Sequence, residues 1–476
     1  MDPTLGNVVA LAFADDTAII ARDTTSAVSL VETVKTAFHQ VGMSINPAKS
    51  VAINVVKGKL CSSHLILADS SVITSITEEE KIRYLGVNFA NGIVFDKKNF
   101  LTELEKDFRN LVTSALLRGD QKMNILNQYV FPKLVYPMQT TPVDLLETPF
   151  LNNVDSLIRQ GVREIVGLPS DSPIPVYYSR QNLRGLGLVR VSWEAQLQHI
   201  NICQTLIKVK DCHLHFVRDL VEEMSQCKQR LAVTAGPEVS VRSIRMELRS
   251  REFDKWTEMP QRGIGVKWFQ TCPATNKWVS NKEGLTSSEW TNAIKLSMNS
   301  MSNRATGGRS AGNPLCRNPT CREMKLMETI PHIRGVCPRS ENLRNSAHHK
   351  IRSSLAHLLK EQKWEVYEEV HCEAVLDDGS KQNRRADIVA IDRRMNRGMI
   401  LDPTLRWETN NDKQDTDINE EKRAIYVPTV PYFQEKYGIT NWTASGLWFG
   451  VRGTASPFLK NFFLTNNLQK RRLQEI

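Results

Sequence analysis

The spacing of apolar residues in the first 95 positions indicates short strands and one helix. Short runs rich in β-branched residues, separated by turn-forming residues, are typical of strands. Between positions 26 and 41, apolar residues instead recur every three or four positions, which is the period of a helix. The predicted elements are strands at 8–13, 17–22, 50–56 and 65–76 and a helix at 26–41.

The pattern then becomes mostly helical, and it returns to mixed α/β after residue 339. Several segments between residues 96 and 300 show the helical spacing, and residues 302–315 have the composition of a linker. The chain is thus predicted to be a multidomain α+β protein. Helices are expected at 100–117, 125–138, 145–166, 193–209 and 412–425, and later strands at 364–375, 386–391, 399–405 and 446–451, before a final helix with a basic tail.

Length, hydropathy and cysteine number exclude several classes of protein. The 476 residues suffice for about three domains. The best late candidate for a membrane span, residues 446–464, is interrupted by Arg452 and Lys460, so a membrane-spanning helix is not expected. The N-terminus lacks the basic region of a secretory signal. Because the cysteines number nine and no such signal is evident, disulfides are not expected.

The basic excess of the chain is concentrated in one stretch. Lys and Arg number 62 in the whole chain, against 52 Asp and Glu. Residues 304–352 contain ten Lys and Arg against three Glu, a net charge of +7. Such a stretch is often only a solvated loop, but it also suits salt-sensitive binding of nucleic acid.

Two adjacent carboxylates, Asp15 and Asp16, follow the first apolar run. Like charges at a tight turn repel each other, and a divalent cation removes that cost. Phosphoryl-transfer enzymes use such carboxylates to hold Mg²⁺. Taken alone, an Asp-Asp pair is more often an ordinary turn.

The surroundings of this pair resemble a known family. Residues 13–16 (Phe-Ala-Asp-Asp), 46–50 (Asn-x-x-Lys-Ser) and 84–86 (Tyr-Leu-Gly) occur in the order of motifs C, D and E in reverse transcriptases of non-LTR retrotransposons. Residues 184–188 resemble a Gly-Leu-Gly segment downstream of the polymerase thumb, although a plain loop explains them equally well. The resemblance implies catalytic Mg²⁺ ligands at Asp15 and Asp16 and nucleic-acid contacts by Lys49, Tyr84 and Gly86.

One departure from that family limits the expected activity. In the family, the polymerase fingers and a further metal-binding aspartate lie before the Asp-Asp turn, whereas twelve residues precede Phe13 here. The chain is therefore expected to be the C-terminal part of a longer polyprotein or a truncated copy. We predict that the purified chain does not extend a primer on an RNA template, and robust incorporation of dNTPs would contradict this.

Three cysteines and a histidine lie within 22 residues, at Cys316, Cys321, His332 and Cys337. Thiolates and imidazole suit Zn²⁺, and four such ligands close a tetrahedral structural site. The alternative is a group of unligated buried cysteines, and Cys272 and Cys372 are possible substitute ligands. The spacing resembles the zinc knuckle before the endonuclease of site-specific non-LTR elements, which implies nucleic-acid contacts by Arg317, Arg322 and Arg334.

A third group of residues follows this cluster. Asp387 and Asp402 are predicted at strand ends 15 residues apart, with Lys422 on the next helix. Two carboxylates can hold Mg²⁺ that activates water, and the lysine can orient that water or offset developing charge. An aspartate at a strand edge is otherwise more often solvated than catalytic, and Glu408 is a further candidate.

This group resembles the PD-(D/E)XK, restriction-like endonuclease of the same elements, in which the lysine has moved to the following helix. Ala386 stands where the family has proline, a residue that is not a ligand. Residues 347–350 stand where the family has Arg-His-Asn. The resemblance implies catalytic Mg²⁺ ligands at Asp387 and Asp402, a catalytic Lys422, and nucleic-acid contacts by His349 and Arg385.

Together the resemblances imply a polyprotein for target-primed reverse transcription, an RNA-directed DNA polymerase with a DNA-nicking endonuclease. The alternatives are a degenerate, non-catalytic nucleic-acid-binding remnant and an unrelated helical scaffold with a chance zinc site. The expected partners are target DNA, element RNA and, if the polymerase is complete, dNTPs, without a membrane and with a homodimer as a further expectation. The expected location is the nucleus, or the cytoplasm when element RNA is bound. The implied parts are the end of the polymerase palm at 1–95, a helical thumb and linker at 96–301, the basic zinc knuckle at 302–340 and the endonuclease at 341–476.

Overall fold

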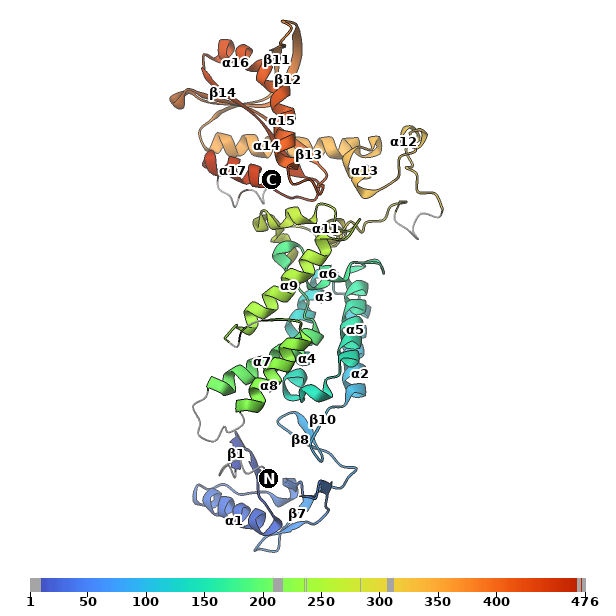
Figure 1. The fold of residues 1–476 in the computed structure, drawn as a ribbon, viewed down its shortest axis with the longest axis vertical. Helices are drawn as coiled ribbons and strands as arrows, with labels where there is room; N and C mark the ends of the chain where they lie inside the picture. The colour runs from blue at the N-terminus through green and yellow to red at the C-terminus, as the bar shows by residue number, and fades with distance from the viewer. Residues whose placement is uncertain are drawn as a thin grey trace. The chain divides into compact units, whose positions relative to one another are not determined.

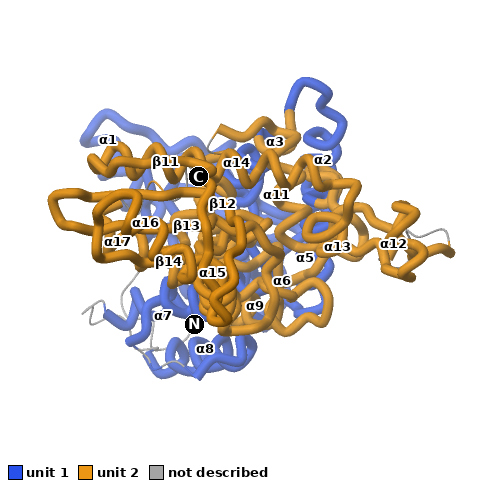
Figure 2. Tube along the Cα trace, turned by 90° about the horizontal axis from the view of Figure 1, so that it is seen from above, with its two compact units in different colours: residues 1–117, 121–162, 189–247 blue, residues 118–120, 163–188, 248–476 orange. Residues whose placement is uncertain are grey.

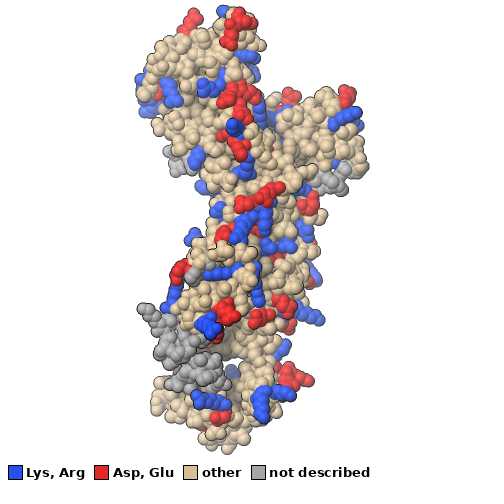
Figure 3. All heavy atoms as spheres, viewed as in Figure 1, with Lys and Arg blue, Asp and Glu red and all other residues tan. Residues whose placement is uncertain are grey.

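The computed structural model describes residues 10–208, 217–234, 236, 238–282, 284–305, 312–468 and 472 (Figure 1). The chain divides into two compact units, one of residues 1–117, 121–162 and 189–247 and the other of residues 118–120, 163–188 and 248–476 (Figure 2). Within the described residues, no helix combines the length and the apolar character that crossing a bilayer requires. Basic and acidic side chains are interspersed on the face drawn in Figure 3. Parts of the predictions, at residues 8–9, 209, 306–311 and 469–471, lie outside the described residues.

The first 95 residues fold as short strands around one helix, as the sequence predicted. β1 (Ala10–Phe13) and β2 (Asp16–Ile19) form an antiparallel hairpin, and α1 (Thr24–Gln40) begins at Asp23, whose carboxylate accepts the N–H of Ser26 at 2.8 Å. The predicted strand at 65–76 is interrupted because Asp69 accepts the N–H of Ser71 and turns the chain. The remaining strands are β3 (Val51–Ala52), β4 (Val55–Val56), β5 (Lys59–Leu60), β6 (Leu65–Ile66), β7 (Val72–Ser75), β8 (Ile82–Tyr84), β9 (Val87–Phe89) and β10 (Ile93–Val94).

The middle of the chain is helical, as predicted, with one difference. The expected single helix at 125–138 contains a π-helical segment, η3 (Leu126–Val130), just before Pro132. Proline lacks the N–H that an α-helix would use there, and a π-turn accommodates the missing bond. The helices are α2 (Lys97–Thr113), α3 (Gly119–Ile125), α4 (Phe131–Thr140), α5 (Thr148–Val166), α6 (Ile174–Tyr178), α7 (Val191–Lys208), α8 (Val217–Arg230), α9 (Val241–Thr257), α10 (Trp278–Asn281) and α11 (Ser287–Ser297).

The Gly-Leu-Gly segment is a tightly packed turn of the second unit. A Cβ at Gly185 would lie 2.1 Å from the carbonyl oxygen of Ser179, so only glycine fits there. The neighbouring Arg184 side chain is buried and donates to Asn276 Oδ1 at 2.6 Å and to the carbonyl of Gly453 at 2.8 Å. These bonds give the segment a structural role, because they join distant parts of this unit.

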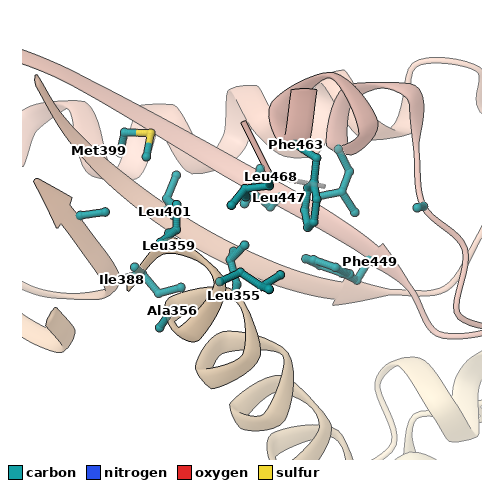
Figure 4. Packing of buried hydrophobic residues seen from close by; sticks show 14 of the residues in the cluster. Leu355, Ala356, Leu359, Ile388, Met399, Leu401, Leu447, Phe449, Phe463 and Leu468 are labelled. Atoms are coloured by element: carbon teal, nitrogen blue, oxygen red, sulfur yellow. The ribbon is translucent and has the colours of Figure 1, made fainter. Parts of the chain in front are cut away.

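A four-stranded sheet dominates the C-terminal part, in the order β11-β12-β13-β14. β13 and β14 are parallel, and the other neighbours are antiparallel. One face packs on Leu355, Ala356 and Leu359 of the long helix before the sheet and on Phe463 near the chain end (Figure 4). The elements are α12 (Pro319–Glu323), α13 (Ile330–Gly335), α14 (Glu341–Glu361), β11 (Glu365–Val375), β12 (Lys381–Asp392), β13 (Arg397–Arg406), α15 (Gln414–Tyr426), α16 (Val430–Tyr437), β14 (Asn441–Gly450) and α17 (Pro457–Thr465).

Candidate metal and catalytic sites

The Asp15-Asp16 pair lies at the tip of the β1–β2 hairpin, as predicted. Phe13 pairs with Asp16 across the hairpin, and Ala14 takes a left-handed φ of 53° in the turn. Both carboxylates are exposed. Among the described residues, no third ligating side chain groups with them closely enough to share a metal.

The other predicted polymerase residues lie at turns of the same segment. Asn46 accepts the N–H of Lys49 through its side chain at 3.3 Å and leaves the lysine exposed. Leu85 and Gly86 both have positive φ, at 47° and 83°, between β8 and β9. The hydroxyl of Tyr136 on α4 donates to the carbonyl of Leu85, which holds the Tyr-Leu-Gly turn against this helix. Their proposed contacts with nucleic acid stay predictions.

Asp387 and Asp402 lie inside neighbouring strands of one sheet, β12 and β13, and not at the strand ends that the sequence predicted. The last pair of the β12–β13 ladder is Ile388 with Leu401, and the two aspartates come immediately beyond it on either strand. They therefore stand opposite each other where the ladder ends. The side chain of Asp402 is 6% exposed and that of Asp387 14%. Two carboxylates that are this little exposed need hydrogen-bonding partners or a bound cation.

Lys422 reaches this point from α15, also as predicted. Its Nζ lies 2.9 Å from Oδ2 of Asp402, and the lysine side chain is 19% exposed. The hydroxyl of Thr404 donates to the other oxygen, Oδ1, at 2.6 Å. Both oxygens of Asp402 are thus held in place by neighbours on the same sheet and on the adjoining helix.

Two further side chains face the carboxylates and were given no role by the sequence. Nε2 of His348 on α14 lies 3.4 Å from Oδ2 of Asp387, and this hydrogen bond raises the pKa of the histidine, to which the charge of Asp402 contributes. Tyr426 lies one helical turn beyond Lys422 and donates to the carbonyl of Arg385 at 3.2 Å. Burial, and then the charges of Asp402 and Asp387, raise the pKa of Tyr426. Both carboxylates therefore act on the same two side chains.

The predicted nucleic-acid residues His349 and Arg385 lie beside Glu369. This residue takes a left-handed φ of 54° inside β11, at the level of Asp387 on the neighbouring strand. Its carboxylate is 3.9 Å from His349 Nδ1 and 3.7 Å from Arg385 Nη1, and it also accepts a bond from Arg352. Desolvation raises the pKa of Glu369, but the charge and hydrogen bond of Arg352, together with the charges of Arg385 and His349, lower it overall.

Glu408 is not part of this site, so its candidacy as a catalytic carboxylate is wrong. Its side chain is fully buried and pairs with Arg452 at 3.0 Å. It also accepts the hydroxyl of Thr454 at 2.9 Å. A buried carboxylate with these partners has a structural role, since all its oxygens are already bonded.

The four predicted zinc ligands converge on one point. The ligand atoms of Cys316, Cys321, His332 and Cys337 all lie within 4.8 Å of one another. The Sγ atoms of Cys316 and Cys337 are 3.6 Å apart, close to the roughly 3.8 Å expected for two thiolates on one tetrahedral zinc. Cys272 and Cys372 lie in two separate apolar cores, which excludes them as substitute ligands.

Two features of this cluster fit a bound cation. Nε2 of His332 is buried, and no described residue offers it a hydrogen bond. Burial and the neighbouring Cys316 and Cys337 raise the pKa of Cys321 to about 11, because thiolates repel one another when nothing neutralises them. A Zn²⁺ would give the imidazole a partner and remove this repulsion.

The three arginines near the Cys/His cluster that were predicted to contact nucleic acid differ in their surroundings. Arg317 is paired, with Nε 3.3 Å from the buried carboxylate of Glu328. Arg322 lies on α12 and is exposed, whereas Arg334 on α13 is half-buried. Arg322 is therefore the freest of the three to meet a phosphate.

Comparisons with known proteins relate this chain to reverse transcriptases and to polyproteins of retrotransposable elements. Residues 2–89 match the family described as reverse transcriptase (RNA-dependent DNA polymerase). Over 97% of the chain, 24% of residues are identical to a "Retrovirus-related Pol polyprotein from type-1 retrotransposable element R2" of Popillia japonica, of which 93% is covered.

Other relatives are longer than the chain. A polyprotein of the same description from Nasonia vitripennis is 22% identical over 80% of the chain, and one from the type-2 element R2DM of Drosophila melanogaster is 25% identical over 84%. The chain spans 35% and 37% of these two relatives, and 48% of a second polyprotein from Popillia japonica.

Proposed function

We propose that the C-terminal part of the chain is a Mg²⁺-dependent endonuclease that nicks DNA. The premise of this proposal is that the chain belongs with the polyproteins of non-LTR retrotransposons. The observation that carries this proposal is the convergence of Asp387, Asp402 and Lys422 at one end of the β12–β13 ladder. Two carboxylates and a lysine, held by adjacent strands and a helix, also support a restriction-like fold for residues 341–476. The knuckle at 302–340 would hold Zn²⁺ and add contacts to nucleic acid.

The chemistry of this site follows from its side chains. Asp387 and Asp402 would hold Mg²⁺, and the bound ion would supply an activated water and stabilise charge on the phosphate. Thr404 fixes the orientation of Asp402 through its 2.6 Å bond. Lys422, at 2.9 Å from Asp402, can donate to a phosphate oxygen of the DNA and offset its charge. His348 holds the carboxylate of Asp387 from the side of α14.

The N-terminal part would contribute to polymerisation. In this proposal residues 1–95 are the end of a palm, residues 96–301 a thumb and linker, and Asp15 and Asp16 hold catalytic Mg²⁺. Within a polyprotein that also supplies the fingers and the further metal-binding aspartate, the nicked DNA would prime copying of element RNA with dNTPs, in the nucleus. The exposed Lys49 and the Tyr84–Gly86 turn would contact the nucleic acid.

Incubation of supercoiled plasmid with the purified chain tests the endonuclease. We expect open circles to form with Mg²⁺ and not with EDTA. Failure to nick, combined with salt-sensitive DNA binding, would favour a degenerate nucleic-acid-binding remnant instead.

A polar face of α14 could guide DNA towards the carboxylates. Six residues at helical spacing line a shallow pocket of about 550 Å³, and none of them is acidic. Amides, hydroxyls and basic groups are typical donors to DNA phosphates. His348, which directly precedes His349 on α14, contacts Asp387. We call this surface the α14 face; it consists of Asn342, Asn345, Ser346, His349, Lys350 and Ser353.

A carboxylate on the α14 face should weaken DNA binding. We expect Asn345→Asp to raise the Kd for duplex DNA by about tenfold at low salt, because a negative charge would repel the nearby phosphates. Fluorescence anisotropy at several salt concentrations measures this. The control is Asn461→Asp, which makes the same change at an exposed position of α17. Equal Kd values for the two variants would exclude the α14 face from binding.

A further inference from the structure

Gly446 stands beside the proposed active site on the edge of the sheet. β14 is the last strand in the order β11-β12-β13-β14, and its parallel register places Gly446 next to Asp402 of β13. Its N–H donates to Oδ1 of Asn419 on α15 at 3.1 Å. This hydrogen bond therefore attaches α15, the helix that carries Lys422, to the sheet at Gly446.

The side chain of Lys422 occupies the space that a larger residue at 446 would need. A Cβ on Gly446 would lie 2.7 Å from both Cβ and Cγ of Lys422, and 3.0 Å from the carbonyl oxygen of Ile418. Contacts of 2.7 Å are shorter than carbon atoms tolerate, since their optimal separation is about 3.5–4.0 Å. The strand and the helix approach this closely only because residue 446 has no side chain.

We propose that Gly446 is a positioning residue of the nuclease, whose missing side chain lets α15 bring Lys422 to Asp402. This inference rests on the proposed endonuclease function. Gly446 would touch neither metal nor DNA and would act only through the lysine. The 2.9 Å contact between Lys422 Nζ and Asp402 Oδ2 is the distance that it sets.

The expected size of the effect follows from the distances. An alanine at 446 must move the stem of Lys422 by about 1 Å to reach a normal carbon contact. The same shift would take the ammonium out of hydrogen-bond range of Asp402. A displacement of about 1 Å in a catalytic group can lower a rate about 10²-fold, so we expect Gly446→Ala to nick DNA about 10²-fold more slowly.

Gly398 provides a matched control. A Cβ there would lie 2.5 Å from the ring of Trp442, so Gly398→Ala crowds the same β13–β14 pair as strongly, but against a tryptophan instead of Lys422. A loss of nicking that only reflects strain in the sheet would appear in both variants. A loss of nicking caused by displacement of Lys422 would appear in Gly446→Ala alone.

The reactivity of Lys422 tests the proposal without any nuclease activity. The folded parent, Gly446→Ala and Gly398→Ala are treated briefly with an acetylating reagent, and mass spectrometry measures modification of Lys422. We expect about tenfold faster modification in Gly446→Ala, because the amine loses a hydrogen bond to a charged partner, and no change in Gly398→Ala. Equal rates in all three proteins would overturn the proposal. If the three proteins are modified at the expected relative rates but the parent never nicks DNA, the proposed endonuclease function is wrong, while the positioning of Lys422 by Gly446 stands.

The double variant Gly446→Ala/Lys422→Ala gives a second measurement. Removing Cγ of Lys422 relieves one of the two 2.7 Å contacts. In urea unfolding, alanine at 446 should therefore destabilise the Lys422→Ala protein less than the parent, and it should not slow its nicking further. Should Gly446→Ala alone not fold, a folded double variant would support the same contact. Equal destabilisation in both backgrounds, or two variants that do not fold, would place the clash on the backbone of α15 and overturn the proposal.

Discussion

Replacement of Asp402 by asparagine should lower the rate of Mg²⁺-dependent nicking about 10³-fold. The variant keeps the size of the side chain but removes the charge that would hold the cation, and metal catalysis contributes several kcal/mol to such reactions. Asp387→Asn should have an effect of similar size, because the two carboxylates stand opposite each other at the end of one ladder. Lys422→Ala should nick faster than either variant, since water can partly replace the ammonium.

DNA binding and folding distinguish a lost metal from a lost structure. Because neither substitution touches the basic surface, the Kd for DNA should change less than about threefold. Asp392→Asn is the matched control, since it makes the same change on β12 at the opposite end, where the side chain caps Arg394 at 3.1 Å. If Asp387→Asn and Asp402→Asn nick as fast as Asp392→Asn, these carboxylates are not catalytic.

Each chain should bind one zinc ion tightly through the Cys316–Cys337 cluster. Removal of zinc by a chelator should unfold residues 316–340, because binding of a structural zinc is worth about 10–16 kcal/mol in small zinc domains. Loss of metal should increase as the pH falls, since protons compete for the thiolates. Elemental analysis and protection of amide hydrogens in this segment measure both effects.

Single substitutions test the ligand set. Cys321→Ser should reduce the zinc content from one atom per chain to well below one. Cys372→Ser is the control, because Cys372 is also buried but its Sγ donates to the carbonyl of Arg384 at 3.6 Å. Full zinc content in Cys321→Ser, or equal loss in Cys372→Ser, would contradict the proposed centre.

The sequence could predict those parts of the sites that short motifs define. The Asp-Asp hairpin, the Cys/His cluster and the strand positions of Asp387 and Asp402 follow from short motifs whose spacing carries their meaning. The motif Lys422-x-x-x-Tyr426 also places Tyr426 on the same face of the helix as Lys422, because residues four apart lie on one face, but the sequence assigned the tyrosine no role.

Other features depend on contacts between distant residues. Consecutive residues of a helix point about 100° apart, so the sequence alone does not tell which of His348 and His349 faces Asp387. The burial of Glu408 depends on Arg452, which lies 44 positions away in the chain. The close approach of α15 to Gly446 likewise has no signal beyond a glycine in a strand.

Asp387 and Asp402 are proposed to hold one divalent cation beside Lys422, and the position of that cation can be mapped directly. Replacing Mg²⁺ by Fe²⁺ in the presence of ascorbate and hydrogen peroxide produces hydroxyl radicals at the bound ion, and mass spectrometry then locates the cuts in the polypeptide. We expect cuts close to residues 387 and 402, suppressed by excess Mg²⁺ and absent from the Asp387→Asn/Asp402→Asn protein. Cuts that lie elsewhere, or that persist unchanged in the double variant, would contradict the proposal.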